Sequence, residues 1–258
     1  MNTNTPTTPF EIVSHRGARF EAPENTVAGF RHAVRLGMTT VELDVHVTRD
    51  DELVVIHDAT VDRTTNGTGA VSDLTLAEIK SLDARSVHED WPEPCQVPTF
   101  RETLEALADM PNIEVEIKKD TPENMEKAVA GVLRIMKELG RTEGIVITSF
   151  EPYALEVAMR LAPDQPRGHM GDWTKEATWE TAARCTVTKV GINLGHATPE
   201  IVDRAHKLGY RAVAWPCNDT EAVEKTKACG FREVCTDAPT TIAPLFGRPV
   251  NEVQPLTP

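Results

Sequence analysis

Two histidines stand at positions where an enzyme could hold an acid/base pair. His15 and His57 each follow a short run of mostly apolar, β-branched residues, EIVS before the first and LVVI before the second. Imidazole groups gain and lose protons near neutral pH, which suits them to proton transfer. One histidine at the end of a strand is more often an ordinary polar residue, but two beside further charges favour an acid/base pair. The remaining histidines lack such a setting.

Carboxylates recur with the period of a strand. In VELDVHV, Glu42 and Asp44 are two residues apart and face the same side. The segment NIEVEIK alternates in the same way and places three charged residues on one face: Glu114, Glu116 and Lys118. Like charges buried together need a cation or a shared proton, and an all-oxygen site suits Mg²⁺ or Ca²⁺. We therefore expect one divalent cation, with an internal salt-bridge network using Lys118 and Arg16 as the alternative.

The elements that carry these residues follow an alternating strand and helix pattern, which is typical of an α/β fold with a parallel sheet. The candidate strands are Glu11–Ser14, Val41–Val47, Leu53–His57, Ile113–Ile117, Gly144–Thr148, Arg167–Met170, Lys189–Asn193, Ala212–Trp215 and Val234–Thr236. The candidate helices are Thr26–Leu36, Phe100–Ala108, Pro122–Leu139, Pro152–Leu161, Lys175–Ala183, Pro199–Leu208 and Glu221–Cys229. Asn25 and Thr198 are expected to cap helices. The pattern predicts a (β/α)8 TIM barrel, whose active sites lie at the carboxyl ends of the strands.

The nine candidate strands exceed the eight places in such a barrel, so one is expected to be peripheral. Only the turn TRDD joins the second and third candidates. After His57 the pattern breaks over residues 58–97, which contain TTNGTG and WPEPC. A loop of this length is usually functional or a small insertion. We predict one domain over residues 1–258 with a small insertion at about 58–97, placed over one mouth of the barrel.

Composition limits the partners. The formal net charge of −13 argues against nucleic acid, because such binding depends on Lys and Arg neutralising phosphates. The five cysteines are odd in number and lack CxxC spacing, which favours reduced thiols in the cytoplasm. The first residues, MNTNTPTTPFE, do not resemble a signal peptide, and a run of about 20 apolar residues is missing, so stable membrane insertion is not expected. The oligomeric state is not predicted.

An ordered series of motifs resembles the glycerophosphodiester phosphodiesterases. The series is HRGARFEAPENT, VELDVHVTRDDELVVIHDATVDRTTNGTG, VPTFRETL, IEVEIK, the SF at 149–150 and TDAP near the end, and it spans about residues 12–246. The resemblance implies a TIM barrel with His15 and His57 as the acid/base pair. It implies metal ligands at Glu42, Asp44 and Glu116. It also implies that Arg16 contacts the phosphate and that Lys118 is an active-site lysine.

The activity implied by the resemblance is metal-dependent hydrolysis of a small-molecule glycerophosphodiester to glycerol 3-phosphate and an alcohol. A lysophospholipase-D-like enzyme acting on longer-chain lipids, and a non-catalytic barrel that binds a phosphorylated ligand, are the alternatives. Phe150 and Trp215 are candidates for an apolar wall of the substrate site or, equally, for core aromatics. One departure from the family pattern is Trp215-Pro216-Cys217-Asn218, where relatives have an aromatic residue followed by TVN. Pro216 removes a backbone donor and predicts a distorted strand end.

Overall fold

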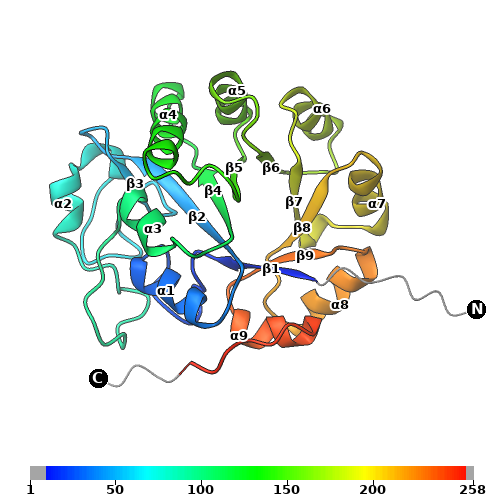
Figure 1. Ribbon diagram of the computed structural model, residues 1–258, viewed down its shortest axis with the longest axis horizontal. Coiled ribbons are helices and arrows are strands. Elements are labelled where there is room, and N and C mark those ends of the chain that lie inside the picture. The colour runs from blue at the N-terminus through cyan, green and yellow to red at the C-terminus, as the bar shows by residue number, and fades with distance from the viewer. Residues whose placement is uncertain (1–9, 254–258) are drawn as a thin grey trace, which may run out of the picture.

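A computed structural model describes residues 10–253, so residues 1–9 and 254–258 of the predicted domain, and with them most of the segment judged not to be a signal peptide, lie outside the described residues. Within residues 10–253, eight parallel strands form a closed ring with helices around it (Figure 1). The strands are β1 (Glu11–His15), β2 (Thr40–Val47), β4 (Asn112–Ile117), β5 (Ile145–Ser149), β6 (Arg167–Gly171), β7 (Lys189–Asn193), β8 (Arg211–Trp215) and β9 (Glu233–Thr236). Pairing of β1 with both β2 and β9 closes the ring. The predicted TIM barrel is confirmed.

Seven helices of the outer layer lie close to their predicted ranges. They are α1 (Val27–Arg35), α3 (Phe100–Ala106), α4 (Pro122–Glu138), α5 (Pro152–Leu161), α6 (Glu176–Arg184), α7 (Pro199–Lys207) and α8 (Thr220–Cys229), and the short α9 (Pro239–Ile242) was not predicted. Thr198 caps α7 as predicted. The prediction for Asn25 is wrong: Thr26 caps α1 by accepting a hydrogen bond from the Gly29 backbone, and Asn25 is free for another partner. Among the described helices, none has the length and apolarity needed to cross a membrane.

The surplus strand is β3 (Leu53–Val55), which pairs antiparallel with β2 on the outside of the ring. Its side chains alternate between two cores. Leu53 and Val55 pack into the main core of the barrel. Val54 packs into a smaller core that we call the lobe core, formed by Val54, Ile56, Val61, Val71, Ile79, Ala84, Cys95 and Val97. Residues 58–97, which include the short helix α2 (Leu76–Lys80), therefore have an apolar centre of their own.

The interior of the barrel contains a buried ion cluster below the strand ends. Lys189 on β7 is 2% exposed, and its ammonium contacts the carboxylates of Glu114 on β4 and Glu233 on β9. Pairing of β4 with β2 aligns Glu114 with Glu42 and, two residues on, Glu116 with Asp44. Lys189 thus neutralises Glu114, and Glu116 lies two residues nearer the carboxyl end of the same strand.

We expect Lys189→Met to destabilise the barrel strongly, because it would leave the buried Glu114 carboxylate without its cation and Glu233 with Arg211 alone, at 3.0 Å. Removing one partner of a buried ion pair costs about 3–5 kcal/mol. Thermal unfolding would measure the loss as a fall of roughly 10 °C in Tm. Lys127→Met, which removes an exposed ion pair on α4, is the matched control and should have little effect. Equal unfolding curves for the two variants would contradict the role assigned to Lys189.

Candidate active site

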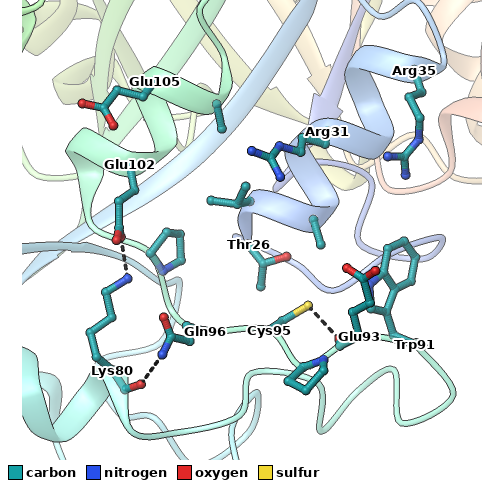
Figure 2. A pocket seen from close by; sticks show the side chains of 15 residues that line it. Thr26, Arg31, Arg35, Lys80, Trp91, Glu93, Cys95, Gln96, Glu102 and Glu105 are labelled. Atoms are coloured by element: carbon teal, nitrogen blue, oxygen red, sulfur yellow. Dashed lines mark hydrogen bonds and ion pairs between the residues drawn. The ribbon is translucent and has the colours of Figure 1, made fainter.

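The predicted site residues converge on a cavity of about 180 Å³ at the carboxyl ends of the strands. Eight of the nine predicted residues line this cavity: His15, Arg16, Glu42, His57, Glu116, Lys118, Phe150 and Trp215. The ninth, Asp44, is 1% exposed and lies beside Glu116 in the strand pairing. A larger cavity of about 870 Å³ lies on the outer face of α1 and α3, and among the described residues neither predicted histidine lines it (Figure 2).

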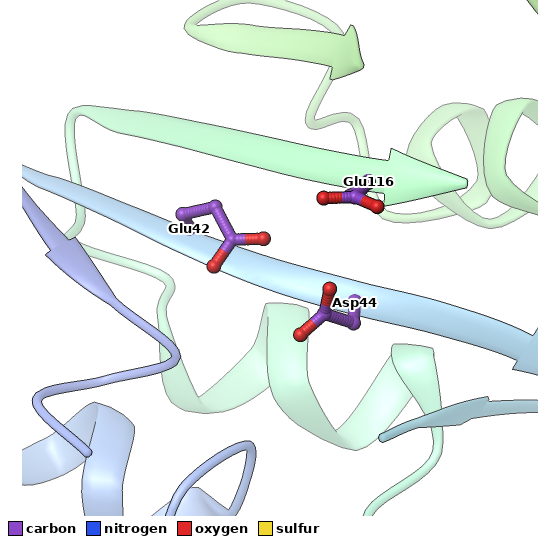
Figure 3. Close-up of side chains that lie close together, drawn as sticks. All are labelled: Glu42, Asp44 and Glu116. Atoms are coloured by element: carbon purple, nitrogen blue, oxygen red, sulfur yellow. The ribbon is translucent and has the colours of Figure 1, made fainter. Parts of the chain in front are cut away.

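Three carboxylates from β2 and β4 form a compact cluster. Glu42, Asp44 and Glu116 each offer one oxygen, and these oxygens lie within 4.8 Å of one another (Figure 3). Two cluster atoms, Glu42 Oε1 and Asp44 Oδ1, are buried and accept no hydrogen bond from the described part of the chain. Buried carboxylate oxygens with an unused acceptor are the ligands that a hard divalent cation prefers. The residues present therefore fit one such ion.

The pKa values of the three carboxylates also indicate a place for a cation. Burial, together with the neighbouring Asp44, raises the pKa of Glu116 to about 7 and that of Glu42 well above its ordinary range. Burial also disfavours the ionised form of Asp44, but Lys118 and Arg16 outweigh it and hold the Asp44 pKa well below its usual value. The two cations thus neutralise only part of the cluster. An additional cation at this point would relieve the remaining repulsion.

The salt-bridge network weighed as the alternative is also present. Lys118 Nζ lies 2.7 Å from Glu116 Oε1 and 3.2 Å from Asp44 Oδ1. Arg16 Nε lies 3.2 Å from Asp44 Oδ2. The network accounts for Asp44 and Glu116, but it leaves Glu42 Oε1 without a partner among the described groups. Salt bridges therefore account for part of the cluster, and Glu42 Oε1 is left as an acceptor that a cation or a proton could satisfy.

His15 is held by the carboxylate that follows the last strand of the barrel. Its Nδ1 donates to Asp237 Oδ1 at 2.5 Å, and its Nε2 lies 3.7 Å from Glu42 Oε2. Asp237 is fully buried, accepts a hydrogen bond from Asn218 Nδ2 at 2.6 Å and forms an ion pair with Arg19, whose Nε lies 2.7 Å from Oδ1. Burial lowers the pKa of His15, although the hydrogen bond to Asp237 opposes the shift. The ring is thus fixed through Nδ1, and Nε2 is the nitrogen available to a ligand.

The ring of His57 is also held by a carboxylate at Nδ1. Its Nδ1 donates to Asp58 Oδ1 at 2.6 Å, and His46 Nε2 donates to its backbone oxygen at 3.2 Å. Burial lowers the pKa of His57, with the Asp44 carboxylate acting in the opposite direction. In both histidines, therefore, a carboxylate accepts from Nδ1, and Nε2 makes no hydrogen bond within residues 10–253. This arrangement can transfer protons at two points of one ligand.

The two predicted aromatic residues form an edge of the cavity. Phe150 is 41% exposed, and its ring meets that of Trp215 edge to face at a centroid distance of 5.7 Å. Phe150 is therefore not a core aromatic residue. Strand β8 ends at Trp215, followed by a cis peptide bond to Pro216, and Asn218 then donates to Asp237. The sequence departure at Pro216 leaves Trp215 lining the cavity.

Residues 15–241 match the model of the glycerophosphoryl diester phosphodiesterase family. The chain belongs to this family of enzymes.

Similar proteins support the same assignment. The glycerophosphodiester phosphodiesterase of Caldanaerobacter subterraneus subsp. tengcongensis is 34% identical over 234 residues, which cover 90% of this chain and 95% of that protein. Among solved structures, an Oleispira antarctica phosphodiesterase in complex with the product sn-glycerol-3-phosphate is 26% identical, with a TM-score of 0.86 over 93% of this chain and 97% of that one. A glycerophosphodiester phosphodiesterase from Agrobacterium tumefaciens is 30% identical, with a TM-score of 0.77 over 92% and 98% of the two chains.

Several supporting residues of this family member were missed from the sequence. Asp237 lies in the motif TDAP, to which the sequence analysis assigns no role. Its position directly after the last strand is the signal that could have identified it as a site residue. Asn25 was interpreted as a helix cap, but its Nδ2 donates to Asp44 Oδ2 at 2.8 Å. His46 is one of the histidines to which the sequence assigns no role, yet its Nε2 donates to the backbone oxygen of His57 at 3.2 Å. Glu24 and Arg63 lie in two separate motifs, and only the folded chain brings their side chains together at 2.7 Å.

Proposed function

We propose that this family member hydrolyses glycerophosphodiesters to glycerol 3-phosphate and an alcohol. His15 and His57 would act as the acid/base pair. One divalent cation, Mg²⁺ or Ca²⁺, would be held by Glu42, Asp44 and Glu116. The observation that carries the proposal is the pair of histidines, each aligned by a carboxylate, beside a cluster of three acidic oxygens. The product named for the Oleispira antarctica relative supports the choice of substrate.

The phosphate would lie among the cations of the cavity. Attack on a phosphodiester gathers negative charge on the non-bridging oxygens, and Arg16 and Lys118 would stabilise that charge where it develops. When bound, the cation supplies further electrostatic stabilisation. These local positive charges also counter the overall charge of −13, which repels an anionic substrate at long range.

The histidines would act in sequence on one substrate. One Nε2 removes the proton of the nucleophile, and the other donates a proton to the departing alkoxide. Asp237 and Asp58 accept the Nδ1 protons and so keep Nε2 facing the substrate, unprotonated in the ring that acts as base and protonated, as an imidazolium, in the ring that acts as acid. The roles of acid and base are assigned to His15 and His57 jointly. The nucleophile is either water or the 2-hydroxyl of the glycerol, which would form a cyclic phosphate.

The remaining parts of the chain complete the proposal. Phe150 and Trp215 would contact the carbons of the substrate, because their edge-to-face pair borders the cavity. We treat the chain as one domain with residues 58–97 as an insertion beside the mouth. We also propose a cytoplasmic location, because all five cysteines are free and four of them are buried. The partner is a small molecule, and nucleic acid is not expected.

A substrate panel tests the activity directly. We expect glycerophosphocholine and glycerophosphoethanolamine, with Mg²⁺ or Ca²⁺ present, to release glycerol 3-phosphate, measured by an enzyme-coupled assay. Phosphorus NMR during turnover would detect a transient cyclic glycerophosphate if the 2-hydroxyl attacks first. Faster turnover of lysophosphatidylcholine would identify the lysophospholipase-D-like alternative. Binding of glycerol 3-phosphate without turnover of any diester would contradict the proposal and identify a non-catalytic barrel.

A further inference from the structure

Arg63, in the segment after His57, contacts two carboxylates that belong to different parts of the site. Its Nε donates to Asp58 Oδ2 at 2.7 Å, and its Nη1 donates to Glu24 Oε2 at 2.7 Å. Its Nη2 is shared between the two, at 3.1 Å from Asp58 Oδ1 and 2.9 Å from Glu24 Oε1. Two edges of one planar guanidinium are thus occupied, a geometry that an ammonium cannot reproduce.

Each of these carboxylates leads to a residue of the proposed mechanism. Asp58 accepts from His57 Nδ1 at 2.6 Å. Glu24 is 6% exposed and accepts from Arg16 Nη1 at 3.0 Å. A continuous chain of charged hydrogen bonds therefore runs from His57 through Asp58, Arg63 and Glu24 to Arg16. Arg63 is its central member, and its side chain is 38% exposed at the surface.

We propose that Arg63 is a positioning residue that orients His57 through Asp58 and Arg16 through Glu24, so that the acid/base and phosphate-binding groups are set by one side chain. The role in turnover rests on the proposed function, whereas the orientation of the His57 ring does not.

Electrostatics support the geometry. The hydrogen bonds from Arg63 hold the pKa of Asp58 well below its ordinary range, so that Asp58 stays ionised and accepts from His57. Burial disfavours ionisation of Glu24, but Arg63 and Arg16 outweigh it and lower the pKa of that carboxyl as well. Without Arg63, Glu24 would depend on Arg16 alone, and Arg16 is already shared with Asp44 at 3.2 Å. Small displacements of such groups cost large factors in rate.

The activity test compares substitutions at Arg63 with a matched control. Arg85 lies in the same segment and holds Asp83 with Nε and Nη2, at 2.9 and 2.6 Å, away from the cavity. We expect Arg63→Ala to lower kcat/KM for glycerophosphocholine on the order of 100-fold, and Arg63→Lys to recover little of it. Arg85→Ala should retain wild-type turnover. Added guanidinium ion should restore part of the activity of Arg63→Ala, because that site is open to solvent. Equal turnover in Arg63→Ala and Arg85→Ala would overturn the role in catalysis.

A second readout does not depend on activity. In protein labelled with ¹⁵N-histidine, the wild type and Arg85→Ala should show His57 with its proton on Nδ1, facing Asp58. Arg63→Ala should show a mixture of tautomers that guanidinium ion shifts back. Unchanged His57 signals in Arg63→Ala would overturn the positioning role, whatever the substrate. A wild-type protein inactive on every diester, but with the expected His57 shifts, would overturn the proposed function alone.

Discussion

Replacing either histidine by alanine should remove nearly all turnover while the barrel stays folded. General acid/base groups contribute on the order of 10²–10⁴-fold each, so His15→Ala and His57→Ala should each lower kcat by at least about 100-fold. Both side chains line the cavity, and their carboxylate partners Asp237 and Asp58 keep ion pairs with arginines, so the Tm should change little. Steady-state kinetics with glycerophosphocholine and a thermal unfolding scan would measure the two quantities.

A matched control and a double variant make this experiment decisive. His206 is exposed on α7, and His206→Ala should behave as the wild type. Because His15 and His57 would act on one transition state, the double variant should lose less than the product of the two single losses. Wild-type kcat in either single variant would contradict the acid/base assignment.

Removing the cation should have an effect of similar size. Excess chelator is expected to abolish turnover, and Mg²⁺ or Ca²⁺ should restore it. Glu42→Gln is the most informative substitution, because Glu42 Oε1 has no competing partner among the described groups. The variant should bind the cation more weakly and gain less thermal stability from it, since a ligand that binds only the folded state stabilises that state. Undiminished activity in excess chelator would contradict the metal site.

The raised pKa values of Glu42 and Glu116 predict how cation binding depends on pH. Burial and then the Asp44 carboxylate raise the pKa of Glu116 to about 7 and that of Glu42 well above its ordinary range. Cation binding requires the ionised carboxylates and therefore releases protons, so the affinity should rise between about pH 6 and about pH 8. Titration calorimetry in two buffers with different ionisation enthalpies would count the released protons. Glu123→Gln, at an exposed carboxylate on α4, is the control.

The barrel and the acidic cluster could be predicted because each is encoded in local alternation. Glu42 and Asp44 are two residues apart on one strand, so their common facing follows from strand geometry alone. The partners of the histidines could not be predicted in this way. Asp237 meets His15 across 222 residues of chain, because β9 pairs with β1 only when the ring closes. The cap of α1 could not be predicted correctly either, because capping propensity favours asparagine over threonine, whereas Thr26 is the residue that caps the helix.

The peripheral position of β3 also determines how the enzyme would lose activity. His15 is the last residue of β1, a strand of the ring. His57 instead comes directly after Ile56, a residue of the lobe core. Small cooperative units of a protein open at a lower free energy than its most stable core. A fluctuation that separates the lobe core would carry His57 out of the cavity while the eight strands remain paired. Inactivation and global unfolding are thus distinct thermodynamic events in this architecture, and hydrogen exchange would detect the first without the second.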